Sequence, residues 1–509
     1  MANGKKGCAV FPRRSAGALL HISSLPGRYG IGTMGQEARL FADFLKEAGF
    51  SYWQVLPLVQ TDYGDSPYQS VFAASGNPYL IDPDGLAAEG LLKKSELAAH
   101  RRPNGGKADY EFLREHKFAL LRRAFSRFDR TDPAFVQFCE EGGFADYALF
   151  MALRAAYGEG FIHWQKPLRL HDASALEAFC AGHADEVAFW QFVQFVFFRQ
   201  WRALKAYVNG LGIRIIGDIP LYVAYDSADV WAAPHLFKLN KDRTRRKVAG
   251  VPPDYFSETG QLWGNPVYDW PRHKADGYAW WIDRIRRAFS LYDVVRIDHF
   301  RGFDRYFEIG AQEETAMHGQ WKRGPGAALF DAARAALGEL SFIAEDLGTL
   351  DEGVYRLLRR TGYPGMKVVQ FAFDGNPGNP YLPANIGVNS VCYTGTHDND
   401  TLLGFVENMP DWEKNNLCAQ LRPLLHSAGI PARLSGPKAV AASLRALALS
   451  TKAQLCVLPV QDILLLGGGA RMNVPSVPEG NWRFRLERRL TAAEAQKCRT
   501  WLQKWDRLP

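Results

Sequence analysis

Short apolar runs alternate with longer amphipathic segments along this chain, and the alternation predicts its architecture. The runs have the length and residue types of buried β-strands, and most are followed by apolar residues at helical spacing. This order predicts a parallel sheet, and eight strand–helix units close such a sheet into a (β/α)8 TIM barrel of the α/β class. The expected strands cover residues 18–22, 53–58, 214–219, 294–299, 341–345, 366–371, 390–394 and 455–460.

Two long stretches interrupt the repeat and set the expected domain organisation. Residues 61–184 lie between the second strand and its helix, and residues 410–452 precede the eighth strand. We expect residues 1–509 to form a single catalytic barrel, with an inserted subdomain at 61–184 and a helical insertion at 410–452. Such insertions occur in the βα loops above the catalytic face. The expected barrel helices cover residues 36–48, 187–211, 278–291, 327–337, 351–361 and 492–504.

Carboxylates follow three of the expected strands, which predicts where the chemistry lies. Asp298, Glu345 and Asp398 come at the ends of the fourth, fifth and seventh apolar runs. A charge is costly inside a buried strand, but at the carboxyl end of a barrel strand it faces the catalytic mouth. The pattern therefore predicts acid-driven catalysis at one end of the barrel.

Asp298 has the features of a nucleophile. Arg296 lies two residues earlier on the same strand, so the two side chains share a face. A neighbouring cation favours the ionised carboxylate, which is the nucleophilic form. The alternative is a buried Arg–Asp pair that only closes the strand end.

Glu345 and Asp398 suit two other roles. Burial near other carboxylates raises the pKa of a glutamate, which makes Glu345 a candidate general acid; the alternative is an ordinary acid before a helix. Asp398 follows His397, and a third carboxylate can hold sugar hydroxyls and stabilise an oxocarbenium-like transition state. The alternative for the segment around Asp398 is a metal site or a solvated turn. We expect no metal, because no companion His cluster has ligand spacing.

Two aromatic segments are expected to line a glucan groove beside these acids. Residues 250–266 contain Trp263 and Asn265, and a second block after strand two contains Tyr63, Asp65 and Ser66. Aromatic faces stack on sugar rings, while amides and hydroxyls bind their hydroxyl groups. The alternative for the longer segment is a hydrophobic loop that folds onto the core.

Composition excludes several other functions. The 61 basic and 54 acidic residues, a net charge of +7, are spread along the chain, which is typical of a solvated surface rather than of a nucleic-acid site. The seven cysteines contain no C-x-x-C pair, so neither a disulfide framework nor a zinc site is expected. No apolar run reaches the ~20 residues of a membrane span, and the protein is expected to be cytoplasmic. No phosphate loop or serine-hydrolase elbow is present, and no cofactor is expected.

Several blocks of this sequence resemble one known family. They resemble the signature segments of the 4-α-glucanotransferases, the amylomaltase or disproportionating-enzyme family, which is glycoside hydrolase family 77 of the α-amylase clan. The resemblance runs from about residue 17 to residue 482. The blocks are residues 21–27, 64–68, 226–231, 252–266, 296–303, 344–348, 364–367 and 396–401.

The resemblance implies a barrel without the C-terminal β-domain of α-amylases, and it implies a role for each acid. Asp298 would be the nucleophile, Glu345 the general acid/base and Asp398 the transition-state stabiliser. The sequence departs from the family pattern at residues 474–479, where the family usually has Pro-Gly-Thr soon after the Arg-Met-Asn triplet. This departure affects the expected shape of the loop after strand eight and not the catalytic acids. The implied sugar contacts are Asp218, Arg296 and His397 on the donor side and Tyr255 and Phe256 on the acceptor side.

The expected activity is retaining transfer of α-1,4-glucan segments through a covalent glucosyl-enzyme intermediate. Donors would be maltodextrins, starch or glycogen, acceptors would be glucose or maltodextrins, and the protein would be a monomer or homodimer. A retaining mechanism requires the Asp298 and Glu345 carboxyl groups to lie about 5–5.5 Å apart. Two alternatives remain open: hydrolysis, with water as the acceptor, and a catalytically silent glucan-binding protein.

Overall fold

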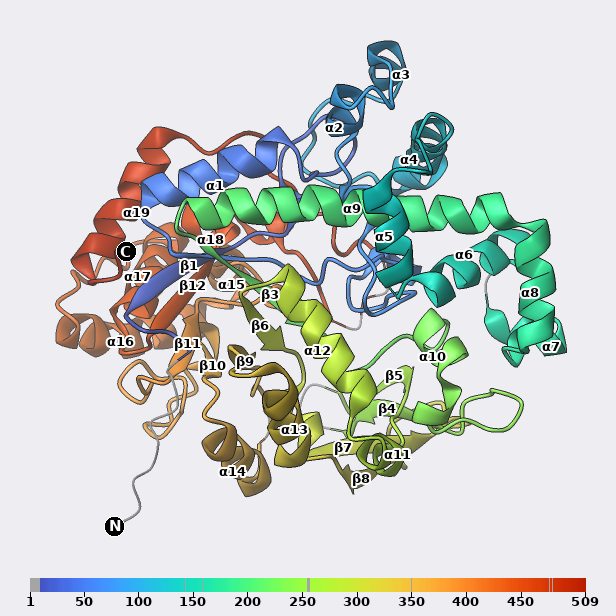
Figure 1. Ribbon diagram of the computed structural model, residues 1–509. Coiled ribbons are helices and arrows are strands. Elements are labelled where there is room, and N and C mark those ends of the chain that lie inside the picture. Colours follow the sequence, from blue (N-terminus) through green and yellow to red (C-terminus); the bar gives the residue numbers. More distant parts are fainter. Residues whose placement is uncertain are drawn as a thin grey trace.

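The core of the protein is a closed barrel of eight parallel strands, which confirms the predicted fold. The computed structural model describes residues 10–141, 143–158, 160–253, 257–348, 350–475, 477 and 479–509. Around the barrel the strand order is β1-β12-β11-β10-β9-β6-β3-β2, so neighbouring strands follow one another along the chain and the last pairs with the first (Figure 1). The strands are β1 Ser15–Leu19, β2 Tyr52–Gln54, β3 Arg214–Ile219, β6 Val294–Ile297, β9 Phe342–Ala344, β10 Gly365–Val368, β11 Ser390–Tyr393 and β12 Leu455–Pro459.

Amphipathic helices surround the barrel, and local capping explains where several of them begin. Asp351 caps α14 by accepting hydrogen bonds from the backbone N–H groups of Gly353 and Val354. Thr491 and Glu494 form a capping box at the start of α19, which packs against α1. The helices around the barrel are α1 Gln36–Ala48, α9 Ala184–Gly210, α12 Ala279–Leu291, α13 Ala327–Leu337, α14 Glu352–Thr361, α15 Leu402–Asn408, α17 Pro437–Ser450, α18 Val460–Leu464 and α19 Ala492–Lys504.

A group of helices between β2 and α9 packs on the long helix α9. Phe192 and Phe195 of α9 contact an aromatic cluster that includes Phe128 and Phe138. The apolar residues in the middle of α9 are therefore buried inside the protein. Within the described ranges, no helix has both the length and the apolar character needed to cross a bilayer. The remaining helices are α2 Pro83–Ala88, α3 Lys94–Ala99, α4 Tyr110–Phe125, α5 Pro133–Glu141, α6 Ala145–Tyr157, α7 Lys166–Arg169, α8 Ala173–Gly182, α10 Ala228–Ala232, α11 Trp270–Ala275 and α16 Asp411–Ser427.

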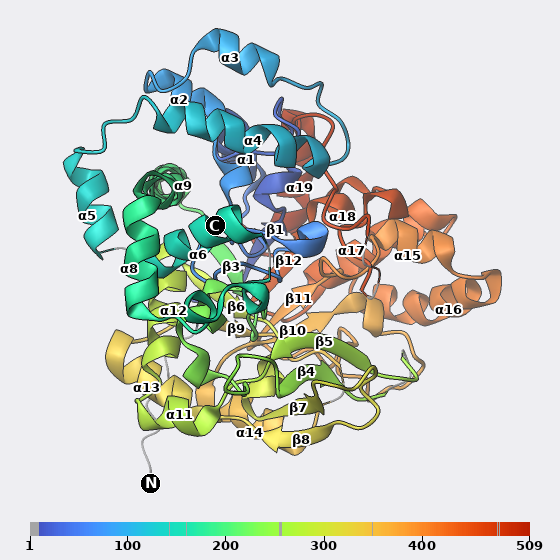
Figure 2. The same ribbon diagram turned by 90° about the vertical axis from the view of Figure 1, so that its right-hand side faces the viewer.

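A second sheet, which the sequence patterns did not predict, lies beside the barrel. Its antiparallel strand order is β5-β4-β7-β8, and Figure 2 shows these strands side by side. The expected aromatic loop at 250–266 is therefore partly a hairpin, in which Val251 lies opposite Gln261. A small apolar cluster of Val248, Phe307 and Ile309, with Ala316, stabilises the sheet. Its strands are β4 Lys247–Val251, β5 Gln261–Pro266, β7 Arg305–Gly310 and β8 Gln320–Arg323.

Candidate active site

The backbones of Asp298 and Glu345 are fixed by hydrogen bonds that continue the barrel ladder. Strands β6 and β9 end one residue before these acids, slightly earlier than the sequence predicted. The N–H of Asp298 donates to the carbonyl oxygen of Ile219 at 3.0 Å, and the N–H of Glu345 donates to that of Ile297 at 3.0 Å. Both side chains therefore leave the barrel from positions that the sheet holds rigidly.

Glu345 has the environment of a proton donor. Its Oε2 accepts a hydrogen bond from the N–H of His299 and its Oε1 accepts one from the N–H of Leu347, both at 2.8 Å. Burial, together with the nearby charge of Asp298, raises the pKa of Glu345 to about 7, against the opposing effects of Arg296 and the two N–H donors. Near neutral pH this carboxyl group therefore exists in both protonated and ionised forms.

Arg296 connects two carboxylates beneath the site. Its Nη2 lies 2.9 Å from Oδ1 of Asp298, and its Nη1 lies 2.6 Å from Oδ2 of Asp218. Burial lowers the pKa of Arg296, but the charges of Asp218 and Asp298 outweigh it and raise the pKa well above its usual value. The guanidinium therefore stays charged and holds Asp298 next to a permanent cation, as its spacing from Arg296 predicted.

Asp218 is also held by a tyrosine that the predicted set of site residues left out. The hydroxyl of Tyr68 donates to Oδ2 of Asp218 at 2.7 Å, and the Tyr68 ring stacks on His397 with the centroids 5.1 Å apart. The other oxygen of Asp218, Oδ1, is buried without a hydrogen-bond partner among the described residues. A buried polar atom without a partner is costly, and the Asp218 side chain has no surface exposed to solvent.

The loop after β12 holds Asp398. Nδ2 of Asn473 donates to Oδ1 of Asp398 at 2.6 Å, and Nη2 of Arg471 donates to the Asp398 carbonyl oxygen at 2.6 Å. Nε2 of His397 lies 3.4 Å from the same Oδ1. Asn473 also donates its N–H to the carbonyl oxygen of His397 at 3.1 Å, so both site residues on this segment are fixed by one neighbouring loop.

Two cavities meet at the acids and bring most of the predicted residues together. One, of about 340 Å³, is lined by Asp298, Asp398 and His397 together with Ser66, Trp263 and Asn265. The other, of about 570 Å³, is lined by Glu345 and residues of the small sheet. Trp263 and His299 line both cavities. The candidate nucleophile and the candidate acid therefore face one groove from its two halves.

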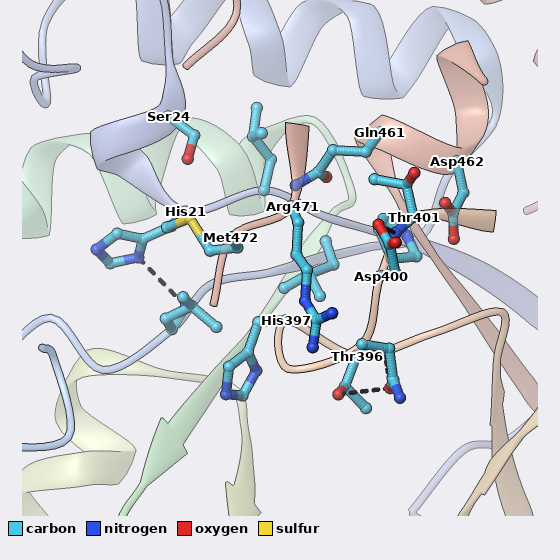
Figure 3. Close-up of a pocket in the computed structure, with 15 residues that line it drawn as sticks. His21, Ser24, Thr396, His397, Asp400, Thr401, Gln461, Asp462, Arg471 and Met472 are labelled. Atoms are coloured by element: carbon cyan, nitrogen blue, oxygen red, sulfur yellow. Dashed lines mark hydrogen bonds between the residues drawn. The ribbon is translucent and has the colours of Figure 1, made fainter. Parts of the chain in front are cut away.

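A third and much smaller cavity, of about 30 Å³, lies behind His397. Figure 3 shows His21, Arg471, Met472 and His397 around it, and His397 also lines the 340 Å³ cavity of the groove. Nδ1 of His21 accepts a hydrogen bond from the N–H of Leu56 at 3.3 Å, and burial, with a smaller effect from His397, lowers the pKa of His21 to about 3. His21 is therefore neutral at physiological pH, and the space beside it fits about one water molecule.

The other predicted site residues lie in different surroundings. Asp65 forms an ion pair with Arg114 at 2.8 Å and is not among the residues that line the two cavities of the groove. Nδ2 of Asn265 donates to the carbonyl oxygen of Val223, which fixes its orientation in the groove wall. Tyr63 begins the short turn Tyr63–Asp65. Tyr255 and Phe256 lie outside the described residues.

The predicted set of site residues left out several residues that line the groove, among them Tyr68, His299, Asn473 and Trp482. Tyr68 lies in the second aromatic block and His299 follows Asp298 directly, so both stood within segments that the sequence had marked. Asn473 and Trp482 lie on the loop after β12, where no pattern indicated chemistry. In the part of the chain that the structure describes, no three His, Cys, Asp or Glu side chains gather as metal ligands.

Comparison with known proteins gives the family. A family model described as 4-alpha-glucanotransferase matches residues 20–491. The chain belongs to the 4-α-glucanotransferase family. It is 48% identical over 483 residues to the 4-alpha-glucanotransferase of Thermus thermophilus, covering 93% of this chain and 95% of the relative. The corresponding protein of Clostridium butyricum is 44% identical over 476 residues, covering 92% and 95%.

Solved structures of 4-α-glucanotransferase relatives agree with this assignment. Amylomaltase from Streptococcus agalactiae, solved in complex with acarbose, superposes with a TM-score of 0.92 at 37% identity over 98% of this chain and all of that one. Amylomaltase from Corynebacterium glutamicum shares the fold, with a TM-score of 0.79 at 19% identity, over 97% of this chain and 75% of that one. The resemblance seen in the sequence is confirmed, and the chain is a glucanotransferase enzyme.

Proposed function

We propose that this enzyme transfers α-1,4-glucan segments from a maltodextrin donor to glucose or another maltodextrin, with retention and through a covalent glucosyl-enzyme intermediate. The observation that carries the proposal is the pairing of two unlike carboxyl groups at one groove. Asp298 lies against the charged Arg296, whereas Glu345 has a pKa of about 7. Retaining glycosyl transfer requires an ionised nucleophile and a protonated acid in this arrangement. The relative in complex with acarbose supports an oligosaccharide in the groove.

In the first step, Glu345 and Asp298 would act together on the bond to be broken. Glu345 donates its proton to the glycosidic oxygen, and the leaving segment departs with a free hydroxyl group. A carboxylate oxygen of Asp298 attacks the anomeric carbon and forms an ester bond to the donor segment. Asp398, oriented by Asn473, stabilises the positive charge that develops on the ring in the transition state.

In the second step, the acceptor reverses this chemistry. Glu345, now ionised, takes the proton from the acceptor hydroxyl, whose oxygen attacks the anomeric carbon. The ester bond to Asp298 breaks, the carboxylate is restored and a new α-1,4 bond forms. Two inversions at one carbon give overall retention.

The two cavities suit the two sides of this reaction. The cavity with Asp298 and Asp398 would hold the donor ring. The cavity beside Glu345 would hold the leaving segment and then the acceptor. Trp263 lines both, so it would contact sugars on either side of the reacting bond.

Incubation with maltotriose tests the proposal. Transfer predicts glucose together with a ladder of longer maltodextrins at a constant number of reducing ends. A steady increase in reducing ends would indicate hydrolysis instead. A protein that binds maltodextrin but produces neither result would be a silent glucan-binding protein.

For the domain organisation, we propose that the chain is one barrel with insertions at 61–184 and 410–452.

A further inference from the structure

The cavity beside Glu345 extends to an aromatic side chain that has no role in the steps above. Trp321 lies on β8, at the edge of the small sheet, and lines this cavity together with Glu345. Its side chain is large and apolar, yet 37% of it is exposed. An exposed aromatic ring in the wall of a substrate cavity is well placed to contact a sugar.

Trp321 is held firmly in place. Its ring packs at 62° against Phe307 of the apolar cluster, with the centroids 5.2 Å apart. The guanidinium of Arg301 lies over the indole, 4.1 Å from its centroid. Arg301 in turn lies 3.5 Å from Oδ2 of Asp351, whose other carboxylate oxygen caps α14. A binding surface that is rigid before the ligand arrives loses little entropy on binding.

The chemistry of this surface fits a neutral pyranose ring. Trp321 offers apolar contact to the C–H groups of the ring, while Arg301 supplies N–H donors and Asp351 supplies carboxylate acceptors for hydroxyl groups. All three residues line the 570 Å³ cavity that contains Glu345. They belong to three different segments, and Arg301 contacts both Trp321 and Asp351.

We infer that Trp321, Arg301 and Asp351 form a distal acceptor subsite, which binds a glucose unit of the acceptor beyond the unit that reacts at Glu345. This inference rests on the proposed transferase function. A maltodextrin acceptor reaches the subsite, whereas a single glucose unit at Glu345 does not. The subsite therefore makes longer acceptors better substrates than glucose.

Competition between labelled acceptors tests the inference. Amylose at a fixed, saturating concentration serves as donor, and incorporation of labelled glucose and labelled maltotriose gives kcat/KM for each acceptor. The maltotriose-to-glucose ratio of kcat/KM is expected to fall about fivefold to tenfold in Trp321→Ala, which is the size of one lost aromatic contact. The loss should be in KM for maltotriose, with Trp321→Phe restoring part of it.

Trp412 provides a matched control. It is 68% exposed at the start of α16 and does not line the cavities of the groove, so Trp412→Ala is expected to leave the ratio within twofold of the parent. An unchanged ratio in Trp321→Ala, or an equal loss for both acceptors, would overturn the inference. A parent protein that transfers to neither acceptor would refute the transferase proposal itself, a separate result.

Discussion

At the scale of single residues, two neighbouring carboxyl groups of the site lie in different electrostatic environments. Asp298 gains a permanent cation from Arg296, while Glu345 is buried and close to the negative charge of Asp298. The charge on Asp298, which is the nucleophile in the proposed mechanism, also helps to keep a proton on Glu345. One side chain thus supports the chemistry of the other.

The pH dependence of transfer follows from the pKa of Glu345. The free enzyme must carry a proton on this group to start the reaction, and its pKa is about 7. We expect kcat/KM for maltotriose to fall as pH rises through about 7, approaching a tenfold loss per pH unit. Initial rates between pH 5 and pH 9 measure this limb. A profile that stays flat to pH 9 would contradict the role of Glu345 as acid.

The same pKa predicts an effect on stability. The pKa of Glu345 in the folded protein is raised from the ordinary 4.5 to about 7. Ionisation of Glu345 therefore lowers the free energy of unfolding at high pH. At low pH the group is protonated in both states and contributes nothing; the cost grows as pH rises from about 4.5 and is complete above about 7. Glu345→Gln should therefore raise the free energy of unfolding at pH 8 by about 1–2 kcal/mol, because about 1.4 kcal/mol per pKa unit is recovered and one N–H acceptor is lost. Urea titrations at pH 5 and pH 8 would show this difference, and equal shifts at both values would count against it.

Asn473 is predicted to act by positioning Asp398. Removing its amide frees Oδ1 of Asp398 from a 2.6 Å hydrogen bond and leaves the carboxylate less firmly oriented, with His397 still 3.4 Å from the same oxygen. Asn473→Ala should lower kcat on the order of tenfold, with KM for maltodextrin changed less than about twofold, if the contact matters mainly in the transition state. Asn481→Ala is the control, since Asn481 bonds only to the backbone of the same loop among the described residues. Equal losses in the two variants would mean that loop shape, rather than the contact, is responsible.

At the scale of elements, the barrel could be predicted from sequence and the small sheet could not. The barrel strands are mostly apolar, because helices cover one face and the barrel interior the other; β12 Leu455–Pro459, for example, is buried at every position. In β8 Gln320–Arg323, by contrast, no residue is fully buried, so its sequence carries no clear period. In the small sheet, β4 and β5 come before β6 in the chain, whereas β7 and β8 come after it. No local sequence pattern reveals pairing between strands so far apart.

The candidate site likewise contains residues that could be found from sequence and residues that could not. Asp298, Glu345 and Asp398 could be found because each follows a recognisable buried strand. Asn473 could not, because it lies on an irregular loop and acts through a contact with a residue 75 positions earlier. Asp65 is the opposite case, a residue that was predicted for the site but does not line the groove. Its segment is polar and aromatic, but the sequence could not show that its carboxylate pairs with Arg114.

Gly250 tests the importance of the hairpin between β4 and β5. A Cβ at this position would lie 2.2 Å from the carbonyl oxygen of Gln261 and 2.6 Å from Ile309, so the backbones would have to separate. Gly250→Ala should shift Trp263 and lower transfer to maltotriose, with a stability loss of about 1–3 kcal/mol. Thermal unfolding and initial rates measure both effects. Gly90→Ala is the comparison for a glycine with no crowding, although its positive φ of 79° carries a cost of its own. A fully active and stable Gly250→Ala protein would contradict the close packing of this hairpin.

At the scale of the whole molecule, one groove joins the barrel to the small sheet. The barrel contributes the acids and Arg296, and the sheet contributes Trp263 on β5 and Trp321 on β8. In the proposed mechanism the barrel performs the chemistry, while Trp321 of the small sheet, together with Arg301 and Asp351, contacts the acceptor.

The central claim is that Asp298 carries the donor segment as a covalent ester, and trapping this ester tests it most directly. In Glu345→Gln, α-maltosyl fluoride can still react, because fluoride leaves without a proton from Glu345, but the acceptor then lacks its base and the ester should accumulate. Intact-protein mass spectrometry should show the gain of one maltosyl group, and peptide mapping should place it on Asp298. The double variant with Asp298→Asn should show no adduct. An adduct on another residue, or none despite turnover of maltotriose by the parent protein, would contradict the account.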